Sequence, residues 1–160
     1  MIGKKLVGAF IALAKAGLTG ISGAATTFTT GVVVPYAING KAYSKAAVAG
    51  GTTPVTDFVT GAAITLLANF GTVVVWALDA AGNVRVIKGS TEPLDAAGNF
   101  LTAPQFPNMP DTVTAFAYTV HKAGSTASGT FTFGVSNWNT TGTSHAVQDV
   151  ITLPDRPQIA

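Results

Sequence analysis

The side chains that could carry acid–base or metal chemistry are few in this sequence. The chain has two histidines, His121 and His145, and no cysteine. Neither histidine lies in an HxxxH or HxxE pattern, and an exposed position at a strand end is the expectation for His121 beside Lys122. His145 and Asp149 would share one face of a strand about 13 Å apart, too far for a dyad. We therefore predict no catalytic residue and no metal site.

The motifs of nucleotide-binding and hydrolytic enzymes are absent as well. The sequence contains no GxxxxGK[ST], no GxGxxG that would open a helix, and no GxSxG. Without cysteine it also has no disulfide, no thiolate zinc site and no thiol nucleophile. The sequence predicts a protein that is not an enzyme and that carries no cofactor.

One six-residue segment occurs twice. Residues 78–83, LDAAGN, recur as residues 94–99. Each copy could be considered a calcium loop, but both lack the alternating oxygen ligands and the distal glutamate of such loops. We interpret the two copies as turns, in which Gly82 supplies the left-handed residue of a type I turn followed by a bulge.

Trp138 is a candidate contact residue because Asn137 and Asn139 flank it. An aromatic ring between two amides could stack on a sugar. Strand alternation over residues 130–139 puts Phe131 and Phe133 on one face and Trp138 on the other. If the two phenylalanines face the core, Trp138 is exposed, and we favour a subunit contact over a glycan contact because aromatic residues are enriched in interface cores.

The elements that must position these residues follow from composition. The 160 residues include nine Lys/Arg and seven Asp/Glu, and 48% are hydrophobic. This length suits one domain, and the low charge argues against disorder and against a coiled coil. The net charge of +2 is too small for a nucleic-acid-binding surface. Within the first 25 residues, no uncharged run approaches the ~20 apolar residues of a membrane span.

The first 25 residues form a segment of their own. Lys4 and Lys5 precede an apolar run and so imitate a secretory signal, but Lys15 interrupts that run. Helical spacing instead aligns an apolar stripe that includes Leu6, Phe10 and Leu18. We predict a partly helical, amphipathic N-terminal arm over residues 1–25, packed on its own domain or on a neighbouring subunit.

From residue 26 the sequence is typical of strands and turns. Asn39-Gly40 between two β-prone runs predicts a type I′ hairpin, and a second hairpin is predicted around residues 79–83. Three prolines within residues 100–110 predict an ordered crossover without ladder hydrogen bonds. Residues 111–121 alternate strictly, with both faces mostly apolar or threonine, which predicts a strand covered on both sides by the core and by the arm or a subunit.

The predicted fold is all-β. Further strands are expected over residues 130–139 and 146–153, so that about seven to nine short strands form an antiparallel β-sandwich or barrel. This domain spans residues 26–153, and residues 154–160 follow as an extended C-terminal tail.

Four segments together resemble a known group of proteins. They are residues 36–41, YAINGK; 73–82, VVVWALDAAG; 106–111, FPNMPD; and 148–157, QDVITLPDRP. Over residues 26–160 the chain looks like small virion structural proteins of tailed bacteriophages, and it is most similar to capsid decoration, or cement, proteins. The resemblance implies a β-rich domain, commonly a homo-trimer, on the outer surface of the capsid, where it reinforces contacts between major capsid protein subunits.

Two functions are therefore expected from the sequence. The first is a decoration protein that contacts the shell through Leu6, Phe10 and Leu18 of the arm, Trp138 of the sheet and Arg156 of the tail. The second is a carbohydrate- or receptor-binding β-sandwich of a phage fibre or a secreted protein, with Trp138 exposed as the glycan platform. Exposure of Trp138 separates the two.

Overall fold

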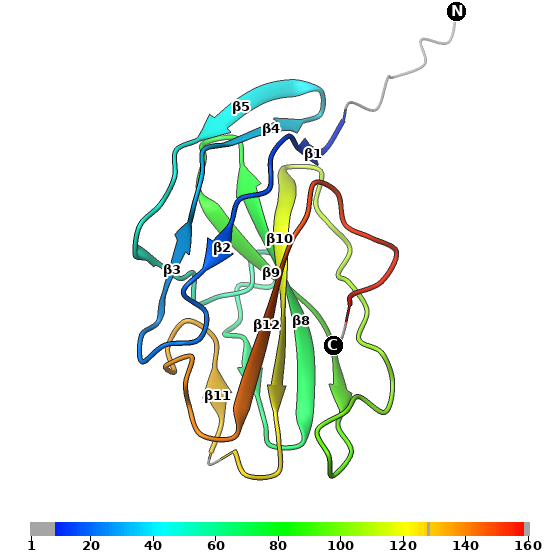
Figure 1. Cartoon of the computed structure of the whole chain (residues 1–160). Helices are drawn as coiled ribbons and strands as arrows, with labels where there is room; N and C mark the ends of the chain where they lie inside the picture. The colour runs from blue at the N-terminus through cyan, green and yellow to red at the C-terminus, as the bar shows by residue number, and fades with distance from the viewer. Residues whose placement is uncertain (1–8, 128, 159–160) are drawn as a thin grey trace, which may run out of the picture.

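The protein is built entirely from β-strands. The computed structural model describes residues 9–127 and 129–158, and across these residues it contains twelve strands and no helix (Figure 1). The strands form four antiparallel sheets, none of which closes into a barrel. The prediction of an all-β fold is confirmed, and the barrel form of that prediction is wrong.

A four-stranded sheet with the order β12-β10-β8-β9 runs through the centre. Its strands are β8 (Phe70–Asp79), β9 (Val84–Pro93), β10 (Val113–Ala123) and β12 (Thr143–Asp149). The predicted second hairpin is β8–β9, and the strand predicted over residues 111–121 is β10. The last strand starts and ends earlier than the predicted 146–153.

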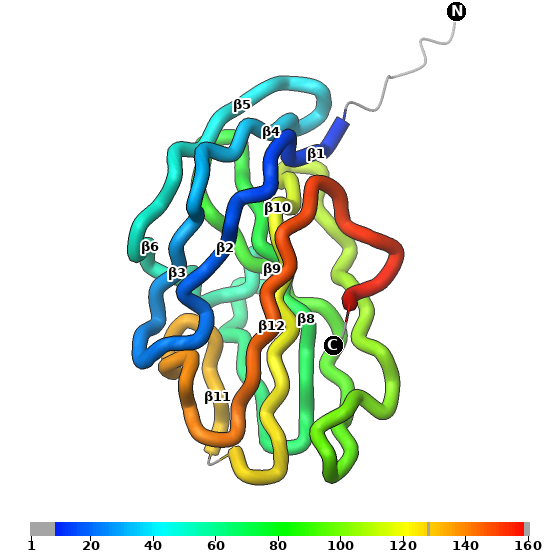
Figure 2. The backbone as a smooth tube through the Cα atoms, in the orientation of Figure 1, coloured from blue at the N-terminus to red at the C-terminus, as the bar shows by residue number. Residues whose placement is uncertain are grey.

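Three smaller sheets lie over one face of the central sheet (Figure 2). The first has the order β1-β4-β5, with β1 (Ile11–Ala12), β4 (Val34–Ile38) and β5 (Lys41–Lys45). The second is β2 (Leu18–Thr19), β3 (Thr27–Thr30) and β6 (Gly51–Thr52), and the third pairs β7 (Thr65–Leu66) with β11 (Phe131–Thr132). Together with Trp76 and Phe116 of the central sheet they enclose the main core, which gives a sandwich-like arrangement.

The turn residues behave as their sequences predict. Asn39 and Gly40 have φ values of 51° and 77°, the left-handed pair that a type I′ turn requires. Gly82 and Gly98 have φ values of 78° and 81° at equivalent places in the two LDAAGN copies. In each copy the glycine N–H donates to the aspartate carbonyl at 3.0 Å, so the two segments are the same turn used twice.

The N-terminal segment is part of the domain, and the prediction of a helical arm is wrong for the residues described. Residues 9–25 form β1 and β2, and Ala12, Ala16 and Leu18 are buried in the main core. Their backbone also joins the far end of the chain, because Ala12 N–H donates to the Ile151 carbonyl and Leu18 N–H donates to Asp149 Oδ1, both at 3.0 Å. The apolar spacing that suggested a helix therefore reflects two short strands separated by a turn.

Strand β10 is buried on both faces, as predicted, but its alternation is not strict. A bulge between Ala115 and Ala117 inserts Phe116, so Phe116 points into the main core while Tyr118 points to the opposite face. On that opposite face Tyr118 packs edge-to-face against Phe106, with ring centroids 5.0 Å apart. The second cover is thus the chain's own proline-rich crossover, and not a subunit or an N-terminal arm.

The crossover docks on β9 at a glycine. Ser90 N–H donates to the Gln105 carbonyl at 3.0 Å, and Gln105 N–H donates to Ser90 Oγ at 2.9 Å. A Cβ atom on the neighbouring Gly89 would overlap the Gln105 carbonyl oxygen and Cγ1 of Val73. Glycine is therefore required where the crossover approaches the sheet.

Replacing Gly89 by alanine is expected to lower the free energy of unfolding by about 1–3 kcal/mol, because the crossover must move away from β9. Urea denaturation at constant m-value measures the change. Gly23→Ala is the matched control, since no atom lies within 4 Å of its added Cβ. Equal stability of the two variants would contradict the close approach.

Candidate functional site

Two histidines meet on neighbouring strands of the central sheet. His121 on β10 lies directly opposite His145 on β12, and their Nδ1 atoms are 2.6 Å apart. His121 is 1% exposed, whereas His145 is half-buried. The rings of Phe131 and Trp138 lie beside both imidazoles, with centroid distances between 5.1 and 6.1 Å. The expectation that His121 is an exposed strand-end residue is wrong.

The hydrogen bonds around the pair link it to Trp76 and Thr119. An indole N–H can only donate, and Trp76 Nε1 donates to Thr119 Oγ1 at 3.0 Å. Thr119 Oγ1 lies 2.6 Å from Nε2 of His121. Where the Thr119 hydroxyl donates to that nitrogen, Nδ1 of His121 carries the ring proton and donates to Nδ1 of His145. In this arrangement the order of donors runs from the buried Trp76 outward to the half-buried His145.

Burial keeps both rings neutral at pH 7. Desolvation, followed by the proximity of His145, holds the pKa of His121 well below its ordinary 6.5. Desolvation lowers the pKa of His145 to about 4, although a hydrogen bond to the Trp138 backbone opposes the shift. A proton on Nδ1 of His145 would face the N–H of His121, so the pair binds protons only when this arrangement is broken.

The pair borders an open hollow. The hollow of about 390 Å³ is lined by His145, Trp138 and the segment 139–144. No group of three or more His, Cys, Asp or Glu side chains that could hold a metal gathers anywhere in residues 9–127 and 129–158. Each ring contacts a threonine hydroxyl and the other ring, and the contact between the two rings joins β10 to β12.

One pattern in the sequence is specific to this pair. Both histidines occur in a Thr-x-His pattern, Thr119-x-His121 and Thr143-x-His145. Residues two apart in a strand share a face, so each threonine lies beside its own histidine. Thr143 Oγ1 lies 3.4 Å from Nε2 of His145. The pairing of the two copies, however, depends on the register between β10 and β12, which local patterns do not reveal.

A second buried polar centre is the Asp57 carboxylate. Its Oδ1 accepts hydrogen bonds from the N–H groups of Val59 and Thr60, at 3.0 and 2.7 Å, and from the Thr60 hydroxyl at 2.9 Å. Its Oδ2 accepts the N–H of Lys88 on β9 at 2.7 Å. Burial alone would raise the pKa of Asp57, but these hydrogen bonds lower it overall. The carboxylate therefore fastens the 57–61 turn to the edge of the central sheet.

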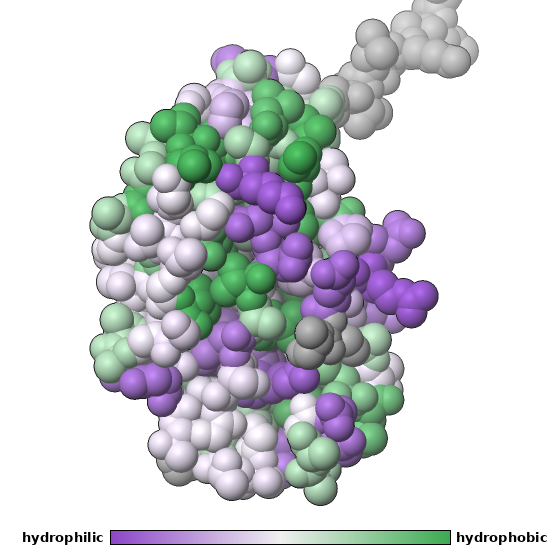
Figure 3. Space-filling view, viewed as in Figure 1, coloured by the Kyte–Doolittle hydropathy of each residue, from purple (hydrophilic) through white to green (hydrophobic). Residues whose placement is uncertain are grey.

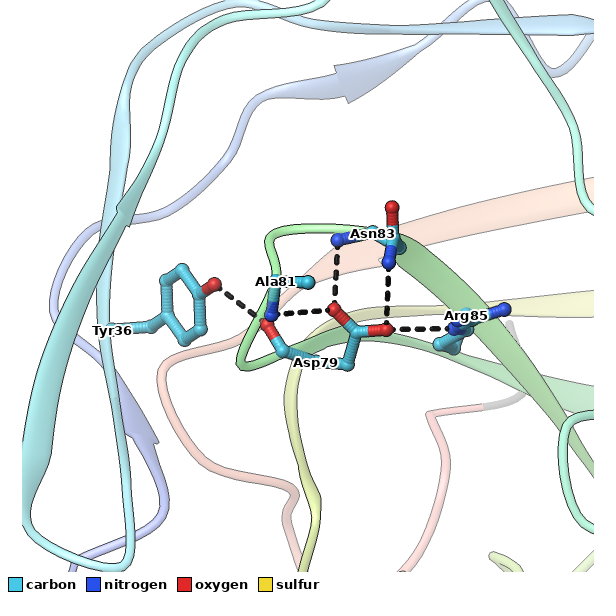
Figure 4. Close-up of polar contacts among 5 residues, drawn as sticks. All are labelled: Tyr36, Asp79, Ala81, Asn83 and Arg85. Atoms are coloured by element: carbon cyan, nitrogen blue, oxygen red, sulfur yellow. Dashed lines mark hydrogen bonds and ion pairs between the residues drawn. The ribbon is translucent and has the colours of Figure 1, made fainter.

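The Asp79 carboxylate organises the β8–β9 turn (Figure 4). It accepts the N–H groups of Ala81 and Asn83 at 2.9 Å, and the Asn83 amide and Arg85 Nε at 3.0 Å. The Tyr36 hydroxyl donates to the Asp79 carbonyl at 2.7 Å and so joins β4 to this turn. N–H donors surround the carboxylate, which fits a turn and opposes a calcium site.

The predicted contact residues are scattered. Phe10 is half-buried and lines a hollow of about 310 Å³ with Met109 and Leu153. Leu18 is buried in the main core. Arg156 is exposed and lies beside the crossover in another hollow, while Leu6 lies outside the described residues. The structure does not bring Phe10, Leu18 and Arg156 together as one surface.

Trp138 is 1% exposed, and the prediction that it faces outward is wrong. Strand β11 ends at Thr132, and Gly134 turns the chain with a φ of 71°. Phe133 and Trp138 consequently point into the same core, with ring centroids 5.2 Å apart. The Trp138 indole donates to the Thr27 carbonyl at 3.0 Å, so its polar atom is also used internally.

Sequence reasoning missed an apolar surface on the sheet β1-β4-β5. Leu13 N–H donates to the Pro35 carbonyl at 2.8 Å, which continues the β1–β4 pairing beyond Ala12. Leu13 and Val33 are 57% and 51% exposed. Strand alternation puts six uncharged residues, Leu13 and Val33 among them, on one side of this sheet. We name this side the outer face, and its residues are Ile11, Leu13, Val33, Pro35, Ala42 and Ser44. Hydrophobic surface is visible over β1 and β4 in Figure 3.

The part of the chain that the structure describes contains no helix capable of spanning a membrane. Comparisons with protein-family models, with curated proteins and with solved structures find no significant match.

Proposed function

We propose that the protein is a virion structural protein, a decoration protein that binds the outside of an assembled phage capsid and stabilises contacts between major capsid protein subunits. The observation that carries the proposal is the outer face. Its Leu13 and Val33 side chains are half exposed and no charged residue interrupts it. Contiguous uncharged surfaces of this kind are typical of lasting protein–protein contacts.

The proposed mechanism is stabilisation by mass action. A protein that binds the assembled shell, and not the free subunits, shifts the assembly equilibrium toward the shell. A concentration of one hundred times Kd contributes about 2.7 kcal/mol for each occupied site. Under this proposal the protein acts as a homo-trimer or another homo-oligomer, without a cofactor or nucleic acid.

The proposed contacts differ from those expected from the sequence. Leu18 and Trp138 are core residues, so neither is retained as a contact. Leu13 and Val33 of the outer face take their place, and Arg156 remains a candidate because it is exposed. The carbohydrate-binding function is the weaker candidate, because it required an exposed Trp138 as its platform.

The test uses purified shells of the virus that encodes this chain. The double variant Leu13→Asp/Val33→Asp introduces two charges into the outer face and is expected to lower shell occupancy at least tenfold. Leu101→Asp is the control, because Leu101 is 67% exposed but lies near the second LDAAGN turn. Deleting residues 1–25 would not be informative, since it removes the core residues Ala12 and Ala16.

The readouts are the copy number on the shell and the temperature at which the shell opens. The wild-type protein and the Leu101→Asp variant should bind and raise that temperature. Failure of the wild-type protein to bind shells would refute the proposed function. If the double variant occupies the shell as fully as the wild-type protein, the outer face is not the surface that binds the shell.

A further inference from the structure

Strand β5 is an open sheet edge. Within the described residues it pairs with β4 on one side and with no strand on the other. The β4–β5 hairpin lies at one end of the molecule, next to β1 (Figure 1). An exposed edge with unpaired backbone groups can receive a further strand.

The register shows which backbone groups are available. Ile38 and Lys41 flank the two-residue turn and therefore form a hydrogen-bonded pair. Pairs alternate along an antiparallel ladder, so Tyr43 and Lys45 also bond to β4, whereas Ala42 and Ser44 do not. The N–H and C=O groups of Ala42 and Ser44 consequently point away from β4 at the open edge.

Charge indicates what this edge can receive. Lys41, Tyr43 and Lys45 share one face of β5, and Lys41 lies 5.4 Å from the centre of the Tyr43 ring. The surrounding sequence is basic, because residues 1–50 contain five lysines and no Asp or Glu. Residues 51–160 contain four Lys/Arg and seven Asp/Glu. An acidic partner strand would therefore meet complementary charge at this edge.

A second copy of the chain fits this edge poorly. Antiparallel pairing of two β5 strands about Tyr43 would place Lys41 of each copy opposite Lys45 of the other. Like charges directly opposite on adjacent strands are destabilising. Lysines on an edge are a known protection against such self-pairing.

We propose that β5 binds an extended acidic segment of a partner protein as an added strand. Acidic side chains four residues apart would face Lys41 and Lys45, and the alternate apolar side chains would extend the outer face beside Ala42 and Ser44. This inference rests on the proposed function for the identity of the partner, the major capsid protein. The strand-binding property itself does not depend on it.

The probe is an eight-residue peptide of alternating glutamate and valine, compared with its lysine–valine counterpart. Binding to the full chain is followed by amide chemical shifts and by hydrogen exchange. The glutamate peptide is expected to shift the amides of Ala42 and Ser44 and to slow their exchange at least tenfold, whereas the lysine peptide should leave them unchanged. The affinity of the glutamate peptide for the chain should also fall as salt is added.

Two variants separate the contribution of backbone hydrogen bonds to peptide binding from the contribution of charge. Ala42→Pro removes an outward N–H that β4 does not use, and Lys41→Glu/Lys45→Glu reverses the charge. Each is expected to weaken binding of the glutamate peptide at least tenfold. The control Lys88→Glu/Lys122→Glu makes the same charge change on the central sheet and should bind normally. A dispersed amide spectrum verifies that each variant is folded.

The outcomes distinguish this inference from the proposed function. No perturbation of residues 41–45, or equal binding of both peptides, overturns the strand addition, even if the protein binds shells. Peptide binding at β5 without shell binding refutes the proposed function and leaves the strand addition standing. Dimerisation through β5 would overturn the choice of an acidic partner.

Discussion

Acidification from pH 7 to pH 4 is expected to lower the free energy of unfolding by about 3 kcal/mol through His145 alone. The pKa of His145 is about 4 in the folded protein and 6.5 when unfolded. Between these values the unfolded chain binds a proton that the folded chain does not, so stability is complete above pH 6.5 and falls as the pH approaches 4. Burial also holds the pKa of His121 well below 6.5, so His121 adds to this loss as the pH falls below 6.5.

Urea midpoints measured at pH 7, 6, 5 and 4 test this expectation. His145→Asn is the informative variant, because its side-chain oxygen can accept the His121 N–H but the residue cannot titrate. Between pH 7 and pH 4, the free energy of unfolding of this variant should fall by about 3 kcal/mol less than that of the wild type. A direct check is the Cε1 proton of His145, which should titrate near pH 4. Equal pH dependence in wild type and variant would contradict the buried neutral pair.

The replacement Asp57→Ala is expected to lower the free energy of unfolding by about 3–5 kcal/mol. It removes four hydrogen bonds to a buried carboxylate and leaves the N–H of Lys88 without its acceptor. Asp57→Asn should also be destabilising. Donors approach both oxygens of Asp57, so the amide NH₂ must face a donor in either orientation.

Thermal or urea unfolding of these variants measures the effect, with Asp95→Ala as the matched control. Asp95 accepts N–H groups from Ala97 and Asn99 within an exposed turn, without reaching a second element. The Asp95→Ala variant should therefore lose much less stability than the Asp57→Ala variant. If the Asp57 and Asp95 variants are equally stable, Asp57 does not fasten the 57–61 turn to β9.

Local sequence was sufficient to predict the elements whose geometry depends on a few adjacent residues. Asn39-Gly40 specified a turn with two left-handed residues, and Gly82 specified the bulge that ends the β8–β9 turn. Both follow from the steric freedom of these residue types. The all-β class followed from the same short-range signals summed along the chain.

What could not be predicted depends on tertiary register. The alternation of β10 is interrupted at Phe116, and one inserted residue reverses the face of every residue that follows. Trp138 was assigned to the wrong side for a related reason, since β11 ends at Thr132. The His121–His145 pair required knowledge of which strands are neighbours.

The apolar strand β10 also shows what composition does and does not specify. A strand without charge on either face must be covered on both, and this much was correct. The sequence could not tell which segment covers it, and the cover of Tyr118 is Phe106 of the same chain. Scarcity of charge therefore predicts burial, whereas the proposed partner surface rests on the exposure of Leu13 and Val33.

The hydrogen bonds from the Ala12 N–H to the Ile151 carbonyl and from the Leu18 N–H to the Asp149 carboxylate have a consequence for the order of folding. The second of these bonds joins residues 131 positions apart in the chain. Closing so long a loop is entropically costly, so β1 and β2 should dock only after β12 has joined the central sheet.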